Sequence, residues 1–155
     1  MSSDGRHTPP PGRPTFGSLF REPYQTYLVW LYGRLKRGEF PDIRVTHSTV
    51  LRRVSTEGAR VTDLAERAGM TKQSMAYIVD DLTELGYVTT SPDPTDGRAK
   101  LVVPTRKGER FLAAARELGE EYEAHVAKLL GAADAKKLRS LLEQLNEKLT
   151  ANPPP

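Results

Sequence analysis

The 155-residue chain contains no cysteine, and this absence excludes several classes of protein at once. Disulfide-stabilised secreted folds, zinc–thiolate sites, iron–sulfur clusters and thiol-based redox sensors all require cysteine side chains. No apolar run approaches the roughly 20 residues that a helix needs to span a bilayer. The first residues lack the apolar stretch and small-residue cleavage site of a secretory signal, so we expect a cytoplasmic protein without membrane association.

Residues that carry metal-binding or catalytic chemistry are also sparse. The three histidines, His7, His47 and His125, are far apart and include no pair at i,i+4 spacing, so we expect no metal site. No phosphate loop, nucleophile elbow or acidic pair with a nearby general base occurs. The sequence therefore predicts a protein that is not an enzyme and uses no cofactor.

Prolines and small residues mark both ends of the chain. Four prolines among glycine, serine and threonine predict an N-terminal arm without regular structure over residues 1–15. Residues 151–155 are expected to form a short tail of the same kind. The net charge of +3 permits nucleic-acid binding but is too small to establish it.

Apolar periodicity predicts helices on both sides of a central segment. Residues 19–35 carry apolar side chains at helical steps, and Gly38 and Pro41 end this stretch. Thr105 is expected to cap a helix of about 26 residues that Gly131 ends. A last helix carries leucines at nearly heptad spacing, namely Leu138, Leu141, Leu142, Leu145 and Leu149. A small domain cannot cover all these apolar edges, so residues 16–45 and 105–150 are predicted to form a helical dimerisation region.

The central residues 46–104 contain the signature of a helix-turn-helix. A helix is expected from near Thr46 to a point before Gly58. Thr62 is the expected N-cap of a short helix that Gly69 stops, and Thr71 that of a longer helix through residue 85. Two capped helices joined by a short turn containing glycine are typical of this motif.

A β-hairpin is predicted to follow. Residues 87–91 and 99–103 are rich in strand-forming side chains with a period of two. The prolines and Asp-Gly pair within residues 92–98 predict a loop longer than a tight two-residue turn. This hairpin is the candidate wing, so the expected fold is mainly α with a small β-hairpin (α+β), a winged helix-turn-helix with a helical dimerisation domain.

The start of the second helix of the motif is the candidate reader of DNA. Gln73 and Ser74 can hydrogen-bond base edges, and Tyr77 can contact a phosphate or a thymine methyl. Lys72 can pair with a phosphate beside the positive end of the helix. Later acidic residues would be repelled, so we expect only the N-terminal half to enter the major groove. An ordinary solvated helix face is the alternative interpretation.

In the candidate wing, Arg98 can project into a narrow minor groove and Asp96 can orient its guanidinium. Lys100 can contact an adjacent phosphate. A plain surface hairpin with a local ion pair is the alternative. Residues 60–110 contain eight Lys or Arg and eight Asp or Glu, so placement of charge, and not its total, favours DNA binding.

These motifs together resemble the MarR family of transcriptional regulators. The matching segments are VTDLA (61–65), TKQS (71–74), VDDL (79–82), LGYV (85–88), DPTDGRAK (93–100) and TRKG (105–108). The resemblance implies a homodimer held by the first and the last two helices, with two winged modules on a pseudo-palindromic operator in double-stranded DNA. It places Gln73, Ser74 and Tyr77 at reading positions and Asp96 with Arg98 as the wing pair.

Regulators of this family usually repress, and many release DNA when a small aromatic or phenolic ligand binds. Tyr24, Tyr27, Trp30 and His47 can line an aromatic ligand pocket between the first two helices. Aromatic residues at helical spacing are more often core or dimer contacts, so both interpretations stay open. The thiol-based sensors of the family are excluded, because the chain has no cysteine.

Two functions from other classes stay open. A winged-helix protein-interaction module without DNA binding is consistent with the zero net charge of residues 60–110. A small-molecule carrier would bind its ligand tightly and show no salt-dependent affinity for DNA.

Overall fold

The computed structural model describes residues 12–152, except for the side chains of residues 97 and 98. Most of the predicted arm and tail therefore lies outside the described residues. In chain order the elements are α1 (Phe16–Arg37), the 3-10 helix η1 (Val45–His47), α2 (Ser48–Leu51), α3 (Val61–Ala68), α4 (Lys72–Glu84), β1 (Val88–Asp93), β2 (Asp96–Pro104), α5 (Arg106–Leu130) and α6 (Ala132–Ala151). The predicted fold class is confirmed, because a mainly helical chain carries one antiparallel two-stranded hairpin.

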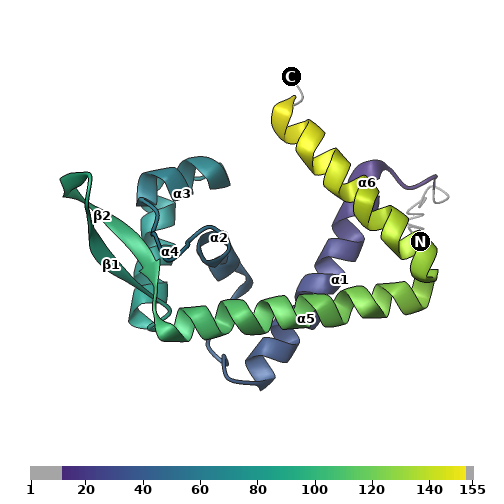
Figure 1. Ribbon diagram of the computed structural model, residues 1–155, viewed down its shortest axis with the longest axis horizontal. Coiled ribbons are helices and arrows are strands. Elements are labelled where there is room, and N and C mark those ends of the chain that lie inside the picture. Colours follow the sequence, from purple (N-terminus) through teal and green to yellow (C-terminus); the bar gives the residue numbers. More distant parts are fainter. Residues whose placement is uncertain (1–11, 153–155) are drawn as a thin grey trace, which may run out of the picture.

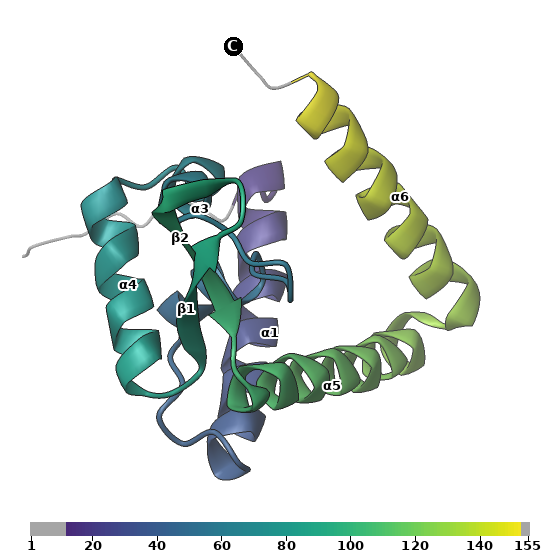
Figure 2. The ribbon, with the colours of Figure 1, turned by 60° about the vertical axis from the view of Figure 1, so that its left-hand side comes forward.

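The long helix α5 connects two parts of the molecule. At its N-terminal end lie α2, α3, α4 and the hairpin, which together form the winged helix-turn-helix (Figure 1). Helix α1 packs across α5, and α6 turns back from the far end of α5. Figure 2 shows α6 standing apart from the winged module, with α5 as the link between them.

The core lies where α1, α5 and the winged module meet. Phe40, Tyr87 and Phe111 are buried, and their ring centroids lie 5.4 to 6.1 Å apart. Edge-on contacts of this kind add to the gain from burying apolar surface. These three rings join the connection after α1, the start of the hairpin and the first turns of α5 into one hydrophobic cluster.

Three helix ends lie at the residues that local signals predict, namely Thr71, Thr105 and Gly69. The Thr71 hydroxyl accepts a hydrogen bond from the backbone N–H of Ser74, and the Thr105 hydroxyl accepts one from Gly108. Gly69 ends α3 in the left-handed conformation, with φ of 63°. Because each cap satisfies a backbone group of its own helix, these ends follow from the nearby sequence alone.

Two predictions in the helix-turn-helix were wrong. The helix expected to run from Thr46 to near Gly58 ends at Leu51, because turns follow at residues 52–53 and 56–57 before Ala59 pairs with Val102 of β2. Arg60, and not Thr62, is the N-cap residue of α3, since its backbone is extended directly after the Ala59 bridge. The Thr62 hydroxyl bonds the Asp63 carboxylate, so it does not cap the helix.

The predicted long loop of the hairpin was also wrong. The strands reach Asp93 and Asp96, and only Pro94 and Thr95 connect them. The turn is tight because the Asp93 carboxylate accepts hydrogen bonds from both the backbone N–H and the hydroxyl of Thr95. Pro92 pairs with Lys100 and Asp93 pairs with Asp96, so residues 97–99 form a bulge on β2.

Helix α6 leaves its apolar stripe exposed. None of its residues is buried, and its five leucines are 37% to 53% exposed. Isolated exposed leucines are common on protein surfaces, but a stripe of five along one helix is typical of an interaction surface. Among the described residues, no helix is long and apolar enough to cross a membrane.

Candidate DNA-binding surface

Helix α4 has the two faces that its sequence predicts. Met75, Val79 and Leu82 are buried, whereas Lys72, Gln73 and Ser74 are exposed. Tyr77 is 72% exposed, an unusual position for a large aromatic side chain. The first turn of α4 contains no acidic residue, so no side chain of this turn neutralises the positive end of the helix dipole. The N-terminal half of α4 therefore presents an exposed polar face to solvent.

A buried histidine holds the other half of α4 in place. His47 is 1% exposed; its Nδ1 accepts a hydrogen bond from the Arg44 backbone, and its Nε2 lies 2.7 Å from Asp81 Oδ2. This pattern assigns the ring proton to Nε2, which donates it to the carboxylate. The Arg44 guanidinium lies 3.2 Å from the same oxygen. Asp81 is one of the later acidic residues that we expected DNA to repel, and its carboxylate instead faces a histidine and an arginine within the protein.

The turn of the hairpin is built around a buried carboxylate that sequence reasoning missed. Asp93 is 6% exposed and accepts hydrogen bonds from Thr95 and from Arg60. Those bonds from Thr95, together with the Arg60 guanidinium, lower the pKa of Asp93 to about 2. The signal that points to this role is the Asp-Pro-Thr sequence, since Asp often closes a turn through its own side chain.

The predicted wing residues lie close to this turn. Asp96 is exposed, and its carboxylate lies 3.8 Å from the Arg60 guanidinium. Lys100 is exposed on β2, opposite Pro92. Arg98 belongs to the bulge at residues 97–99, but its side chain lies outside the described part of the structure, so the predicted Asp96–Arg98 pair stays a prediction.

Comparisons with known proteins agree with this geometry. A profile of the MarR family matches residues 42–99, the segment from the connection after α1 into the bulge of β2. An uncharacterised HTH-type transcriptional regulator of Mycobacterium bovis is 29% identical over 63% of this chain and 69% of its own. Wild-type MarR of E. coli, in its apo form, superposes with a TM-score of 0.70 at 22% identity, over 86% of this chain and 98% of that one. The chain matches the MarR family over residues 42–99 and has the fold of MarR.

A further structural neighbour is a MepR mutant of S. aureus bound to an oligodeoxyribonucleotide. It superposes with a TM-score of 0.59 at 18% identity, over 88% of this chain and 99% of that one. The relatives and neighbours are transcriptional regulators and not enzymes, as the sequence predicts. The protein is accordingly a DNA-binding transcriptional regulator.

The structure divides the four predicted ligand-binding residues between two places. Tyr27 and Trp30 pack against Tyr122 of α5, with ring centroids 5.0 and 5.2 Å away. Burial raises the pKa of the Tyr27 phenol. Tyr24 is 47% exposed on the same helix, whereas His47 bonds α4 as described above. Tyr122 is the aromatic contact that the prediction left out.

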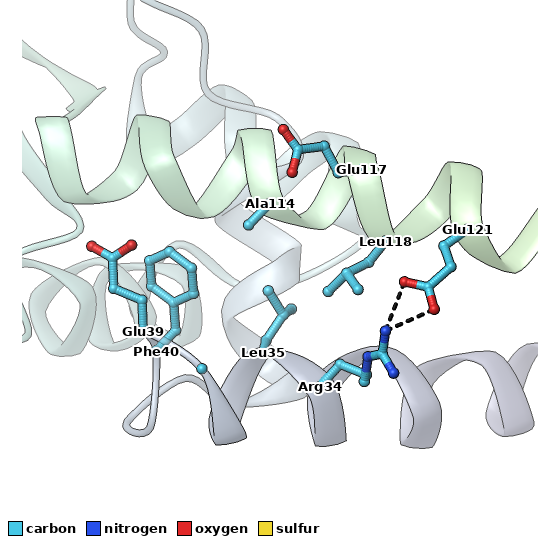
Figure 3. Close-up of a pocket in the computed structure, with 9 residues that line it drawn as sticks. Arg34, Leu35, Glu39, Phe40, Ala114, Glu117, Leu118 and Glu121 are labelled. Carbon is cyan, nitrogen blue, oxygen red and sulfur yellow. Dashed lines mark hydrogen bonds and ion pairs between the residues drawn. The ribbon is translucent and has the colours of Figure 1, made fainter.

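The structure also has an open groove of about 330 Å³ between the end of α1 and α5 (Figure 3). Leu35, Phe40 and Leu118 supply its apolar lining. Glu121 accepts two hydrogen bonds of 2.7 Å from Arg34 beside the groove, as the dashed lines in Figure 3 show. The predicted ligand residues lie elsewhere on α1 and η1, so this groove does not support that prediction. Within the described residues, no group of acidic or histidine side chains is arranged to hold a metal ion.

Proposed function

We propose that this protein is a homodimeric repressor that binds a pseudo-palindromic operator. The observation that carries the proposal is the exposed polar start of α4, where Lys72, Gln73 and Ser74 precede the exposed ring of Tyr77. Recognition helices of this motif place their N-terminal residues against base edges in the major groove. The MepR neighbour bound to an oligodeoxyribonucleotide supports the same mode.

In this proposal each exposed residue of α4 has its own role. Gln73 and Ser74 hydrogen-bond base edges, although the Ser74 hydroxyl also accepts a 2.9 Å bond from Thr71. Tyr77 packs on a thymine methyl or donates to a phosphate. Lys72 pairs with a phosphate beside the helix N-terminus. The ion pair of Asp81 with Arg44 reduces repulsion at the other end of the helix.

In the same proposal the wing contacts the minor groove of the DNA. Arg98 enters the groove from the bulge of β2, Asp96 orients it, and Lys100 contacts a neighbouring phosphate. The bulge supports this role, because bulges redirect side chains away from the regular alternation of a strand.

The dimer is supported by the exposed apolar residues of the outer helices. The α6 leucines and, at the start of α1, Phe16, Leu19 and Phe20 are all at least 37% exposed. A second copy would bury both sets and place two α4 helices on one side of the assembly. Two reading helices separated by about 34 Å match one turn of DNA.

We further propose that a small aromatic or phenolic ligand relieves repression by binding beside Tyr24, Tyr27, Trp30 and His47. The half-buried rings of Tyr27 and Trp30 and the exposed ring of Tyr24 support this site, since aromatic ligands stack on such surfaces. His47 bonds α4 directly, so a ligand that displaces it would alter the support of the reading helix. Alanine at Trp30 and His47 should weaken effector binding in a folded dimer.

One observation favours a second function. Residues 60–110 carry no net charge, whereas most DNA-binding modules are basic. A winged-helix module that binds another protein would need no excess of cations. We place this function second, because Lys72 lies at the start of α4 and Arg98 and Lys100 lie in the wing, where phosphates would be contacted.

The deciding experiment is a selection of duplexes from a random library with the purified full chain. The enriched duplex is then titrated at several salt concentrations with the wild type, with Arg98→Ala and with the control Arg37→Ala, which removes one charge from α1. We expect salt-dependent specific binding that Arg98→Ala weakens about tenfold and the control leaves unchanged. If no duplex is enriched, the protein-interaction module is the better proposal.

A further inference from the structure

Arg60 links the tip of the wing to the start of the helix-turn-helix. Its Nε lies 2.7 Å and its Nη2 2.5 Å from Asp93 Oδ2, and Nη2 lies 3.8 Å from Asp96 Oδ2. Arg60 is also the N-cap residue of α3. One guanidinium therefore contacts both residues that close the hairpin turn, from an element 33 residues earlier in the chain.

The backbone before Arg60 is fixed on the hairpin itself. Ala59 and Val102 exchange two hydrogen bonds of 3.0 and 2.9 Å, so the chain pairs with β2. Gly58 makes this approach possible, because its φ is +83° and a Cβ there would lie 2.8 Å from the Cβ of Leu101. Residues 58–60, which we call the wing anchor, thus lie against β2 through one β-bridge at Ala59, and the side chain of Arg60 reaches the tip.

The bonds at the tip determine where the bulge of β2 lies. Asp93 pairs with Asp96 across the turn, and residues 97–99 follow directly as the bulge. Arg98 is the middle residue of that bulge. Any change in the Asp93–Asp96 end of the hairpin would therefore move the backbone that carries Arg98.

We propose that Arg60 is a positioning residue that fixes the wing tip and thereby the approach of Arg98 to the minor groove. This proposal rests on the proposed role of the wing in DNA binding. Arg60 also balances the charge of Asp93 and Asp96, which would otherwise lie together at the tip near phosphates. Its side chain is 38% exposed, and its Nε and Nη2 face the wing carboxylates. Arg60 therefore acts through the wing and does not itself contact DNA.

A double-mutant cycle on the selected duplex tests this role. The variants are Arg60→Met, which keeps the apolar stem, Arg98→Ala and the double variant. Arg67→Met, in the last turn of the helix that Arg60 precedes, is the matched control. We expect Arg60→Met to weaken specific binding about tenfold, as loss of one groove contact does. In the Arg98→Ala background, Arg60→Met should cause no further loss of affinity, because the Arg98 contact that Arg60 supports is already absent. The control should bind like the wild type.

The opposite pattern overturns the proposal. Additive losses, together with a salt slope that falls by about one more unit in the double variant, would mean that Arg60 contacts a phosphate directly. Wild-type affinity of Arg60→Met would mean that the wing needs no anchor. Should Arg60→Met fail to fold, Arg60→Lys takes its place, with the same cycle and a smaller expected loss, since one ammonium cannot reproduce the guanidinium fork.

Amide hydrogen exchange separates the anchor from the DNA-binding proposal. Arg60→Met should speed amide exchange in β1 and β2 and leave exchange in α4 unchanged, because only the wing tip loses its contacts with the guanidinium. Unchanged amide exchange in the hairpin would overturn the proposal that Arg60 fixes the wing tip. Failure of the wild type to select any duplex would instead overturn the proposed function, since the exchange measurement involves no DNA.

Discussion

The Tyr87 hydroxyl donates a 2.6 Å hydrogen bond to the Asp42 carboxylate, and this pair joins the reading module to the rest of the chain. The other oxygen of Asp42 accepts a 2.9 Å bond from Lys107 Nζ at the start of α5. Lys107 also donates to the Leu85 carbonyl and lies 4.1 Å from the centre of the Tyr87 ring. Three segments therefore meet at one carboxylate, between the end of α4 and the beginning of α5.

Removing this carboxylate should destabilise the fold. Asp42→Ala leaves the Tyr87 hydroxyl without its acceptor and Lys107 with only the Leu85 carbonyl, and a lost bond to a charged group costs about 1.5–3 kcal/mol. Asp42 is one-third exposed, so we expect a value near the lower end, about 1–2 kcal/mol, measured as the free energy of unfolding in urea.

An exposed ion pair nearby provides the control for Asp42→Ala. Glu39 and Arg110 lie 2.6 Å apart, but both side chains are 56% exposed. Glu39→Ala should therefore cost less than about 1 kcal/mol. Equal losses for Asp42→Ala and Glu39→Ala would contradict a special structural role of the Asp42 carboxylate.

Two glycines of α5 should respond to alanine in opposite directions. A Cβ on Gly108 would lie 2.1 Å from the Tyr87 carbonyl oxygen, and a backbone atom cannot move aside by changing a rotamer. We expect Gly108→Ala to destabilise the protein by at least about 2 kcal/mol. Gly119→Ala meets only the Tyr27 hydroxyl at 3.8 Å and should stabilise α5 by about 0.5–1 kcal/mol. Thermal unfolding followed by circular dichroism distinguishes the two variants. Shifts of the unfolding midpoint in the same direction for both would contradict the close contact at Gly108.

Features of the fold that depend on neighbouring residues could be predicted from the sequence. Thr71 and Thr105 each cap a helix through a bond to a residue three positions later, and the apolar spacing of α4 already separates its buried face from its reading face. Gly69 follows the same logic, because a left-handed residue that ends a helix is usually glycine.

The contacts that organise the candidate site could not be predicted in this way. Arg60 and Asp93 are 33 residues apart, His47 and Asp81 are 34 apart, and Lys107 is 65 residues from Asp42. No local pattern specifies which acid a distant base will reach. The prediction of the N-cap residue of α3 was wrong for the same reason, since the pairing of Ala59 with β2 keeps the backbone extended up to the start of the helix. Long-range pairing overrode the preference of threonine for a cap.

Acid should weaken the wing through Asp93. Its pKa is lowered in the fold to about 2, so its bonds contribute stability above the unfolded pKa near 3.9, and this contribution is lost as the pH falls from there toward 2. Asp93→Asn removes the titrating group. The stability difference between wild type and Asp93→Asn should therefore be constant above about pH 5 and shrink below pH 4, as measured by thermal unfolding. A difference that stays constant down to pH 2 would contradict the role of the charged carboxylate.

A charge in the leucine stripe of α6 should separate the proposed dimer. Leu145 is 37% exposed, and a glutamate there would be desolvated against the second copy. We expect Leu145→Glu to weaken association at least about tenfold while the helical circular-dichroism signal is retained. Gln144→Glu, on the neighbouring exposed position, is the control. Sedimentation equilibrium measures both, and a Leu145→Glu protein that associates like the wild type would place the dimer interface elsewhere.

The two kinds of DNA contact assigned to α4 should differ in their dependence on salt. Lys72→Ala removes a phosphate contact, so it should weaken binding to all duplexes alike and lower the slope of log K against log salt by about one. Gln73→Ala removes a base contact, so it should reduce discrimination between the selected duplex and a single-base variant by about 1–3 kcal/mol with little change in slope. Glu84→Gln, at the far end of the helix, controls for a general effect of changing its surface. If instead Lys72→Ala changed the preferred base and Gln73→Ala changed the slope, α4 would have to lie in the groove in a different orientation from the one that its exposed face indicates.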